Sequence, residues 1–287
     1  MTIKQYSERH PTQAAFVLLL IAFCLRILDA FVIRTDELIG EQVIPKVGGL
    51  IVILVYVWLV KGNLAGIGFH GSRWKTSLVL GFLFMAIGLA CGYLVEWLYL
   101  QLAGESPSLL AAAESHPVFS GEAATSGLLL VFILIVGNFI NSAMEEGLFR
   151  GVMITHLGSR MSMVRANLIQ AALFGVWHTT VPLRAYLDGQ MDLPMAVIGS
   201  LVYVLLSGMV GFVWGVFYQK TNSIWTSWSA HTLNNTTLNF VHITTAAGMP
   251  STMPLRVTVI ALVMVGLLPL FKKWTTRLEM SEVVPWI

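Results

Sequence analysis

The chain has 287 residues, of which 56% are hydrophobic and only 11% are charged. A soluble domain has about 25% charged residues, so the composition excludes an ordinary soluble fold. The net charge is +2 and the basic residues are scattered over loops, which argues against nucleic acid as a partner. The two cysteines, Cys24 and Cys91, both lie in apolar runs, so neither a disulfide framework nor a metal-type cysteine spacing is indicated.

Long apolar runs recur along the whole chain. A run of about 20 apolar residues can cross a hydrocarbon core of roughly 30 Å as a helix. Lipid cannot hydrogen-bond the backbone, and these runs are continuous rather than alternating, so helices are favoured over a barrel. The sequence therefore predicts an all-α fold, a polytopic integral membrane helical bundle of about eight transmembrane helices that forms a single transmembrane domain over residues 1–287. The predicted spans are 14–33, 47–60, 76–100, 126–156, 165–181, 195–218, 223–243 and 255–271.

The first apolar run, Ala14 to Ile33, is predicted to be a retained anchor helix. It follows a basic stretch, but it contains Arg26 and Asp29 and shows no small-x-small cleavage site. These two charges lie three residues apart on one helix face. They are expected to neutralise each other and to serve structure rather than chemistry.

The basic residues predict the orientation of the bundle. If the N-terminus is cytoplasmic, the outer segments hold only Arg34, Lys46, Arg184 and Arg256. The inner segments hold a larger set, as the positive-inside rule expects: Lys4, Arg9, Lys61, Arg73, Lys75, Arg150, Arg160, Arg165, Lys220, Lys272, Lys273 and Arg277. Both termini are therefore predicted to be cytoplasmic. The outer loop 101–125 has no Lys or Arg, and a small re-entrant or surface segment is expected there.

Small residues four positions apart allow two membrane helices to approach closely. Such pairs occur at Gly88 and Gly92, Gly147 and Gly151, and Gly211 and Gly215. Close helix packing is predicted at these pairs.

Ionisable and amide side chains gather on three of the predicted helices. A charge near the bilayer centre costs at least about 2.5–3.5 kcal/mol, so such a residue is a functional candidate. The fourth helix carries Asn138, Asn141, Glu145, Glu146 and Arg150; the fifth carries Asn167, Gln170 and His178; the seventh carries Ser227, His231, Asn234, Asn235 and Asn239. These helices are predicted to share one polar site.

The spacing along the chain brings Glu145 and His178 to a similar depth. The two residues are symmetric about position 161.5, within a turn at 158–162 that joins two antiparallel helices. Each lies roughly 20–25 Å of helix from the turn, so the two side chains are expected to meet. On the seventh helix, His231 and Asn235 are four apart and share one face.

Several of these residues also have an ordinary structural interpretation. Glu146 and Arg150 have the spacing of a helical ion pair, which favours a supporting role for both. A lone membrane histidine is more often a packing residue than a catalyst, and the depth that His178 shares with the carboxylate is what favours chemistry. Asn234 and Asn239 are predicted only to hydrogen-bond between helices, a contribution of roughly 0.6 kcal/mol each.

A carboxylate beside a neutral histidine in a dry cavity can hold and deprotonate a water molecule. A second histidine and an amide one turn later can direct N–H groups at the oxyanion that forms when water attacks an amide carbonyl. The buried set therefore predicts peptide hydrolysis without an acyl-enzyme. No Ser/His/Asp set or nucleophilic cysteine is evident at a comparable position, although serines of the fourth and seventh helices leave that route open.

Three short motifs occur in order along the chain: Glu145-Glu146-x-x-x-Arg150, Phe174-x-x-x-His178 and His231-x-x-x-Asn235. Together they resemble the signature motifs of the CAAX protease and bacteriocin-processing (CPBP) family, which includes the Ras-converting CAAX endopeptidase. The resemblance covers residues 126–243, the motif-bearing catalytic core. The remaining helices are matched only by general hydrophobicity.

The resemblance implies an intramembrane glutamic endopeptidase of eight helices, with a cavity reached from the cytoplasm and the membrane. It implies that Glu145 activates water, that His178 is its partner, and that His231 and Asn235 stabilise the oxyanion. No cofactor is expected. The expected substrate is a membrane-anchored or lipidated protein, and the preferred location is a bacterial inner membrane.

Three other functions fit parts of the pattern. Glu and two His could ligate zinc and leave a position for water, but there is no His-Glu-x-x-His helix and an amide is a poor fourth ligand. A proton-coupled transporter would use buried Glu and His as a relay, but the sequence has no paired repeats or matching broken helices. A silent scaffold that binds partner helices would not require Glu145 and His178 together.

Overall fold

The computed structural model describes residues 1–61, 63–113 and 127–283. The described chain is mainly helical, which confirms the predicted all-α class, and two short strands are the exception. The elements in chain order are α1 (Ile3–Arg9), α2 (Pro11–Leu28), the π-helix η1 (Asp29–Ile33), α3 (Thr35–Ile39), the π-helix η2 (Ile44–Gly48), α4 (Gly49–Lys61), the 3₁₀ helix η3 (Leu64–Ile67), α5 (Trp74–Leu102), β1 (Ser108–Ala111), α6 (Gly127–Glu146), the π-helix η4 (Gly147–Ile154), α7 (Thr155–Gly158), α8 (Met163–Trp177), α9 (Thr180–Leu187), α10 (Leu193–Thr221), α11 (Ile224–Phe240), β2 (Val241–Thr244), α12 (Met253–Gly266) and α13 (Leu268–Arg277).

Each predicted span coincides with a helical segment whose ends differ by a few residues. Among the described residues, four helices are long and apolar enough to cross a membrane, or five if the bent pair α12 and α13 is one span. The spans expected at 47–60, 165–181 and 223–243 correspond to helices that do not meet this criterion. The chain is a helical membrane bundle, and the number of eight crossings stays a prediction.

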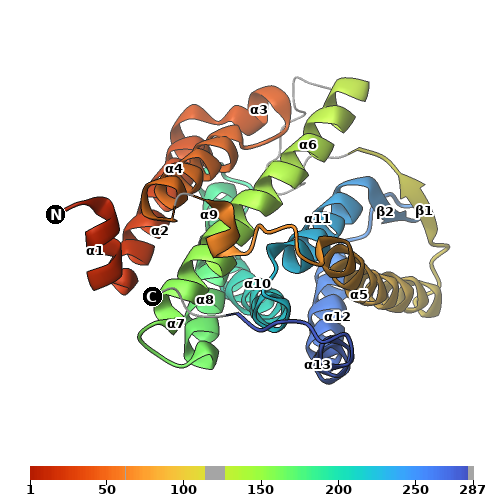
Figure 1. Cartoon of the computed structure of the whole chain (residues 1–287). Coiled ribbons are helices and arrows are strands. Elements are labelled where there is room, and N and C mark those ends of the chain that lie inside the picture. The colour runs from red at the N-terminus through yellow and green to blue at the C-terminus, as the bar shows by residue number, and fades with distance from the viewer. Residues whose placement is uncertain (62, 114–126, 284–287) are drawn as a thin grey trace.

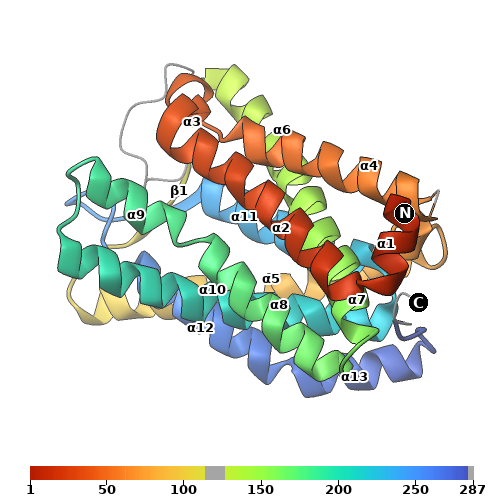
Figure 2. The same cartoon turned by 90° about the vertical axis from the view of Figure 1, so that its left-hand side faces the viewer.

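The helices pack into one bundle with a shared apolar core. In Figures 1 and 2, α2 and α4 lie on one side and α5, α12 and α13 on the other, with α8 and α11 between them. The most extensive helix contacts join α10 to α8 and α11 to α5. Because α6 also packs on α11, and α8 packs on η4, the helices that carry the three motifs are neighbours in space.

The predicted fourth helix changes its winding at the first motif. The α-helix α6 ends at Glu146, the π-helix η4 continues from Gly147 to Ile154, and α7 completes the span at Gly158. A π segment inside an α-helix is rare and frequently occurs at a functional site. All eight residues of η4 are buried, so this wider turn lies in the core.

Two features depart from the helices that were expected. The seventh helix ends at Phe240, and residues 241–244 form β2, which pairs antiparallel with β1 (108–111). The predicted outer segment 101–125 therefore contains a strand, and its part from 114 to 125 lies outside the described residues. The last helix bends by 44° between Gly266 and Leu268. Pro269 follows this break, and a proline cannot donate the backbone hydrogen bond that would continue the helix.

Glycine allows the predicted close approach of helices. A Cβ on Gly92 would lie 2.6 Å from Cγ1 of Ile260, and a Cβ on Gly215 would lie 1.8 Å from Oδ1 of Asn167. A Cβ added at Gly88, Gly151 or Gly211 would also lie 3.0 Å or less from the nearest neighbouring atom. At Gly147 the nearest atom is 3.6 Å away, an ordinary contact. Close packing is confirmed at every predicted glycine except Gly147.

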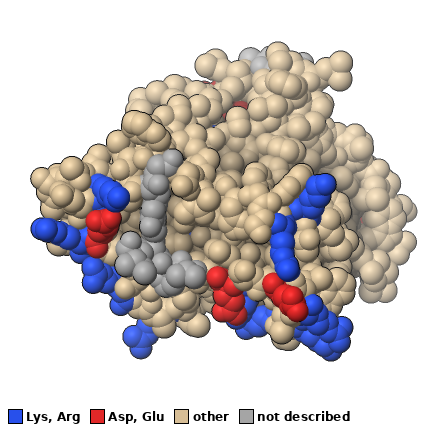
Figure 3. Space-filling model, viewed as in Figure 1, with Lys and Arg blue, Asp and Glu red and all other residues tan. Residues whose placement is uncertain are grey.

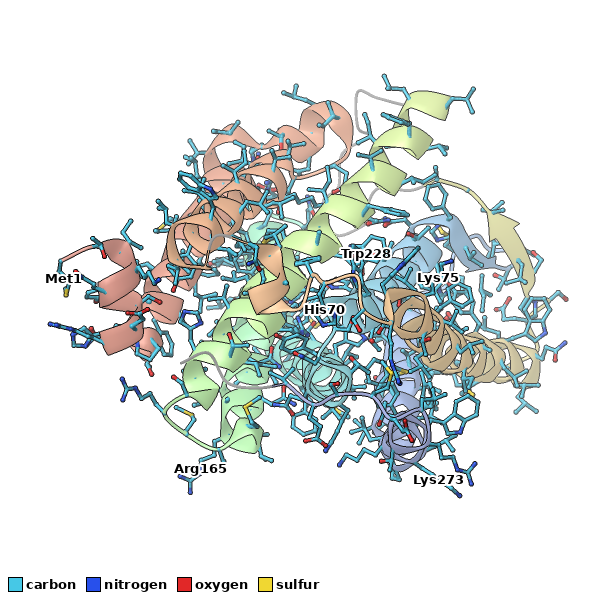
Figure 4. The ribbon with its side chains drawn as sticks, in the orientation of Figure 1. Met1, His70, Lys75, Arg165, Trp228 and Lys273 are labelled. Carbon is cyan, nitrogen blue, oxygen red and sulfur yellow. The ribbon has the colours of Figure 1, made fainter. Side chains whose placement is uncertain are left out.

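Large apolar side chains are exposed on several helices. Leu20 of α2, Leu129 of α6 and Leu201 of α10 are each at least 60% exposed, as side chains in contact with lipid are. Figure 3 shows charged side chains gathered along one edge of the face drawn, while most of that face carries none. Arg165 and Lys273 lie at this edge of the bundle (Figure 4). Both belong to the basic set that the sequence assigns to the cytoplasm.

Candidate active site

The two adjacent carboxylates at the end of α6 both face His231 of α11. Glu146 Oε1 lies 2.8 Å from Nδ1 of His231, and Glu145 Oε2 lies 3.6 Å from its Nε2. The three side chains are at most 3% exposed. A carboxylate oxygen only accepts hydrogen bonds, so Nδ1 of His231 donates to Glu146 and the ring is held with Nε2 toward Glu145. The first and third motifs are thus joined by direct contacts.

Arg150 supports Glu146 from inside η4. Its Nη1 lies 3.1 Å from Oε1 of Glu146, in a pair with no solvent exposure. Its Nη2 donates to the backbone carbonyl of Gly211 at 3.2 Å, and its guanidinium lies 4.3 Å from the ring centroid of Phe174. These contacts agree with the ion pair predicted from the spacing. They also bring all three motifs together, because Phe174 belongs to the second.

His178 lies at the C-terminal end of α8 and is half-buried. Its Nδ1 lies 2.8 Å from the carbonyl oxygen of Phe174, so Nδ1 carries the proton and Nε2 is the free acceptor of the neutral ring. No described hydrogen bond or ion pair joins Glu145 directly to His178. The carboxylate contacts His231 and Trp177 instead, although it interacts electrostatically with His178 as well.

Two tryptophans complete the site and were not predicted as site residues. The indole Nε1 of Trp177 donates to Glu145 Oε1 at 2.9 Å. The ring of Trp214 stacks on His231, with centroids 4.3 Å apart and planes inclined by 23°. The signal for Trp177 was its place beside His178 in the second motif. Trp214 lies on α10, between the second and third motifs, and only the packing of α10 identifies it.

A cavity of about 340 Å³ opens beside this cluster. Its polar lining is formed by His178, Tyr203, Ser207, Trp214, His231, Asn234 and Asn235. Its apolar lining comes from α10, α11 and α12 and includes Val202, Leu206, Leu238, Met253 and Val257. Glu145 is 2% exposed and is not among the lining residues, but His231, whose Nε2 lies 3.6 Å from its Oε2, lines the cavity.

The amides of α11 have different environments. Asn235 lines the cavity, and its Oδ1 accepts from Nδ2 of Asn234 at 3.2 Å. Asn234 lines the cavity too, so it does not only pack between helices, as the sequence suggested. Asn239 accepts from Asn138 Nδ2 of α6 at 3.1 Å, which confirms the predicted hydrogen bond between helices.

The zinc alternative requires at least three protein donors around one point. Among the described residues, no group of three or more His, Cys, Asp or Glu side chains is placed so that it could hold a metal ion. Glu145, Glu146 and His231 converge, but one oxygen of Glu146 and Nδ1 of His231 are already bonded to each other. The donor set therefore gives the zinc hypothesis no support.

Comparison with protein families places this cluster in a known context. Residues 127–237 match the family described as type II CAAX prenyl endopeptidase Rce1-like. The match lies within the motif-bearing stretch 126–243 and includes all three motifs. A comparison with curated proteins found no match. The resemblance carried by the motifs is thus confirmed: residues 127–237 of this integral membrane chain are similar to the type II CAAX prenyl endopeptidase Rce1-like family.

Proposed function

We propose that this protein is an intramembrane glutamic endopeptidase in which Glu145 is the general base. The observation that carries the proposal is the environment of the Glu145 carboxylate. Its Oε1 accepts the indole N–H of Trp177, while its buried Oε2 accepts no hydrogen bond from the described residues. A buried carboxylate with one oxygen fixed and the other open is suited to accept a proton from water.

His178 supplies the second contact for the attacking water. Because its Nδ1–H is bound to the carbonyl of Phe174, its Nε2 can accept a hydrogen bond. One water hydrogen is directed at Glu145 and the other at His178, which leaves a lone pair for the scissile carbonyl carbon. Glu145 takes the proton as the C–O bond forms.

His231 and Asn235 stabilise the oxyanion in this mechanism. Both line the cavity, where a substrate carbonyl can approach them. A protonated His231, held through Nδ1 by Glu146, donates from Nε2, and Asn235 donates from its amide nitrogen. The proton held by Glu145 then passes to the leaving amine, the C–N bond breaks, and the new carboxyl contains the water oxygen. No acyl-enzyme forms.

The proposed substrate is a membrane-anchored or lipidated protein. Apolar residues of α10 and α12 form much of the cavity lining, so an extended peptide beside an anchor or lipid can bind there from the membrane. We place the protein in a bacterial inner membrane with both termini in the cytoplasm. The distribution of basic residues supports the orientation.

The test is proteolysis of a panel of tail-anchored and prenylated peptides by the purified protein in lipid vesicles. Wild type is compared with Glu145→Gln and His178→Ala, each shown to be folded by its thermal melting profile. The proposal predicts specific cleavage by wild type and loss in both variants. Equal cleavage by wild type and both variants would show that another group activates water.

A further inference from the structure

Arg26 is a buried cation of the first membrane helix that the mechanism above does not use. Its side chain lies on α2, and the residue is 8% exposed. The sequence suggested that Arg26 and Asp29 neutralise each other, but no direct ion pair joins them among the described residues, although Asp29 attracts the guanidinium. Asp29 accepts hydrogen bonds from the backbone N–H groups of Thr35 and Ile44 instead.

The partners of Arg26 belong to the end of α8 and to the turn that follows it. Its Nε donates to Oγ1 of Thr180 at 2.9 Å. Its guanidinium carbon lies 4.7 Å from the ring centroid of Trp177, the geometry of a cation–π contact. Arg26 therefore contacts the side chain that binds the proposed general base.

Trp177 connects the two charges. The residue is 1% exposed, its ring lies beside Arg26, and its Nε1–H donates to Oε1 of Glu145. A cation over an indole face withdraws electron density from the ring and so strengthens the N–H as a donor. The three side chains are thus connected by successive contacts: Arg26 of α2 contacts Trp177 of α8, which contacts Glu145 of α6.

Among the described residues, the charge of Arg26 has no ordinary ion-pair partner. No described carboxylate lies within 4.0 Å of its nitrogen atoms. Glu145 and Asp29 both attract the guanidinium without contacting it. An unpaired buried cation in a membrane helix is costly, so its position beside Trp177 requires an explanation.

We propose that Arg26 and Trp177 are positioning residues for Glu145, in an inference that rests on the proposed function. Trp177 holds Oε1 and thereby directs Oε2 toward the water. Arg26 fixes the indole and favours the ionised carboxylate that a general base requires. Helix α2 lies outside the matched segment 127–237, so the active site extends beyond the family domain.

The first test removes the indole N–H but keeps an aromatic ring. Trp177→Phe is expected to lower kcat on the best-cleaved farnesylated tail peptide by about 10- to 100-fold, the loss typical of a hydrogen bond to a charged group, with KM unchanged. The acidic limb of the kcat profile is expected to move to higher pH, because the charged carboxylate loses a donor. Trp228→Phe is the matched control, since that indole donates to the carbonyl of Phe139. It should leave both quantities unchanged.

The second test separates charge from shape at position 26. Arg26→Met is expected to reproduce the kcat loss and the shift of the acidic limb. Arg26→Lys retains a cation near the ring but loses the planar guanidinium. Its kcat and the pH of its acidic limb should lie between those of Arg26→Met and wild type. Arg160→Met removes an exposed arginine that bonds the carbonyl of Arg9, and should have no effect. If Arg26→Met fails to fold, Thr180→Val removes the acceptor of Arg26 and should shift the limb in the same direction.

A third measurement needs no substrate. The carboxylic-acid infrared band that is lost in Glu145→Gln reports the protonation of Glu145 in the purified protein. Its titration midpoint is expected to rise by about one pH unit in Trp177→Phe and in Arg26→Met. Unchanged midpoints and unchanged kcat in folded variants would overturn the positioning role, even if Glu145→Gln is inactive. Full activity of Glu145→Gln would instead overturn the proposed function. The infrared titration would then still show whether Trp177 and Arg26 affect the protonation of Glu145.

Discussion

Nδ1 of His231 lies 2.8 Å from Oε1 of Glu146, in a contact that joins the third motif to the first. The same Glu146 oxygen pairs with Arg150 at 3.1 Å. One carboxylate therefore fixes a histidine ring on α11 and neutralises a fully buried cation. We therefore propose that Glu146 is a supporting residue, whose loss should affect folding as well as catalysis.

Glu146→Ala is expected to lower the free energy of unfolding by about 3–5 kcal/mol, because it leaves Arg150 buried without a counter-charge. Thermal unfolding in detergent micelles measures the change. The double variant Glu146→Ala/Arg150→Met should recover part of the loss, since it removes the unpaired charge. Glu145→Ala leaves the indole N–H of Trp177 unpaired and should cost about 1–3 kcal/mol. A larger loss for Glu145→Ala than for Glu146→Ala would reverse these roles.

His178→Ala is expected to lower kcat strongly and to change stability little. The side chain is half-buried and makes one described hydrogen bond, to Phe174, so its loss should cost about 1 kcal/mol of stability. The loss of kcat should be about 10²- to 10⁴-fold, as for a group that takes part in proton transfer. Exposed His10 provides the control, and His10→Ala should retain full activity. Matching losses of kcat in both variants would exclude a specific role.

Gly215→Ala tests the close contact between α10 and α8. The added Cβ would lie 1.8 Å from Oδ1 of Asn167, whose amide already donates to the carbonyl of Phe212 at 3.0 Å. Overpacking of this kind costs about 1–3 kcal/mol. At Gly266 no atom lies within 4 Å of the new Cβ, so Gly266→Ala should be tolerated. Equal melting temperatures for Gly215→Ala and Gly266→Ala would contradict close packing of α10 on α8 at Gly215.

Ionisation of Asp36, in the short helix α3, is expected to make the stability of the protein depend on pH. Burial raises the pKa of its carboxyl, and Arg184 Nη1, 3.9 Å away, acts to lower it. Because the folded-state pKa lies above the unfolded value, ionisation of Asp36 costs stability as the pH rises through the raised pKa. Asp36→Asn should therefore increase the melting temperature more at neutral pH than in mild acid.

Asp188 provides the contrast with the opposite sign. Burial acts to raise the pKa of its carboxyl, but hydrogen bonds from Arg184 and Arg34 leave that pKa below its ordinary value. Its stabilising contribution is present above the unfolded-state pKa and is lost as the pH falls through the folded-state pKa. Asp188→Asn should lower the melting temperature at neutral pH and have little effect in strong acid. A higher melting temperature of Asp188→Asn at neutral pH would contradict a stabilising role for the hydrogen bonds from Arg184 and Arg34.

Much of the site was predictable because its residues follow local spacing rules. Glu146 and Arg150 pair at the expected helical spacing, and His231 and Asn235 both line the cavity. Hydrophobic length identified the helices, because lipid requires the backbone to bond within each span. The contact of Glu145 with His231 was not predicted, since depth along two helices does not determine which faces meet.

The remaining features depend on contacts between distant segments. β1 pairs with β2 across a sequence separation of more than 130 residues, as in the pair Leu109 with Ile243, and no helical or turn pattern encodes that pairing. The change to a π-helix after Glu146 depends on the packing of η4 in the core. Arg26 seemed to pair with Asp29 because both occupy one helix face, but tertiary contacts gave each a different partner.

The most direct test of the account is the initial rate at which purified Glu145→Gln cleaves a membrane-anchored peptide in vesicles, compared with untreated and chelator-treated wild type. The account predicts that the substitution lowers the rate at least about 100-fold while the fold is retained, and that the chelator has no effect. Cleavage by Glu145→Gln at the wild-type rate, or loss of wild-type activity on chelation, would contradict a glutamate-activated water.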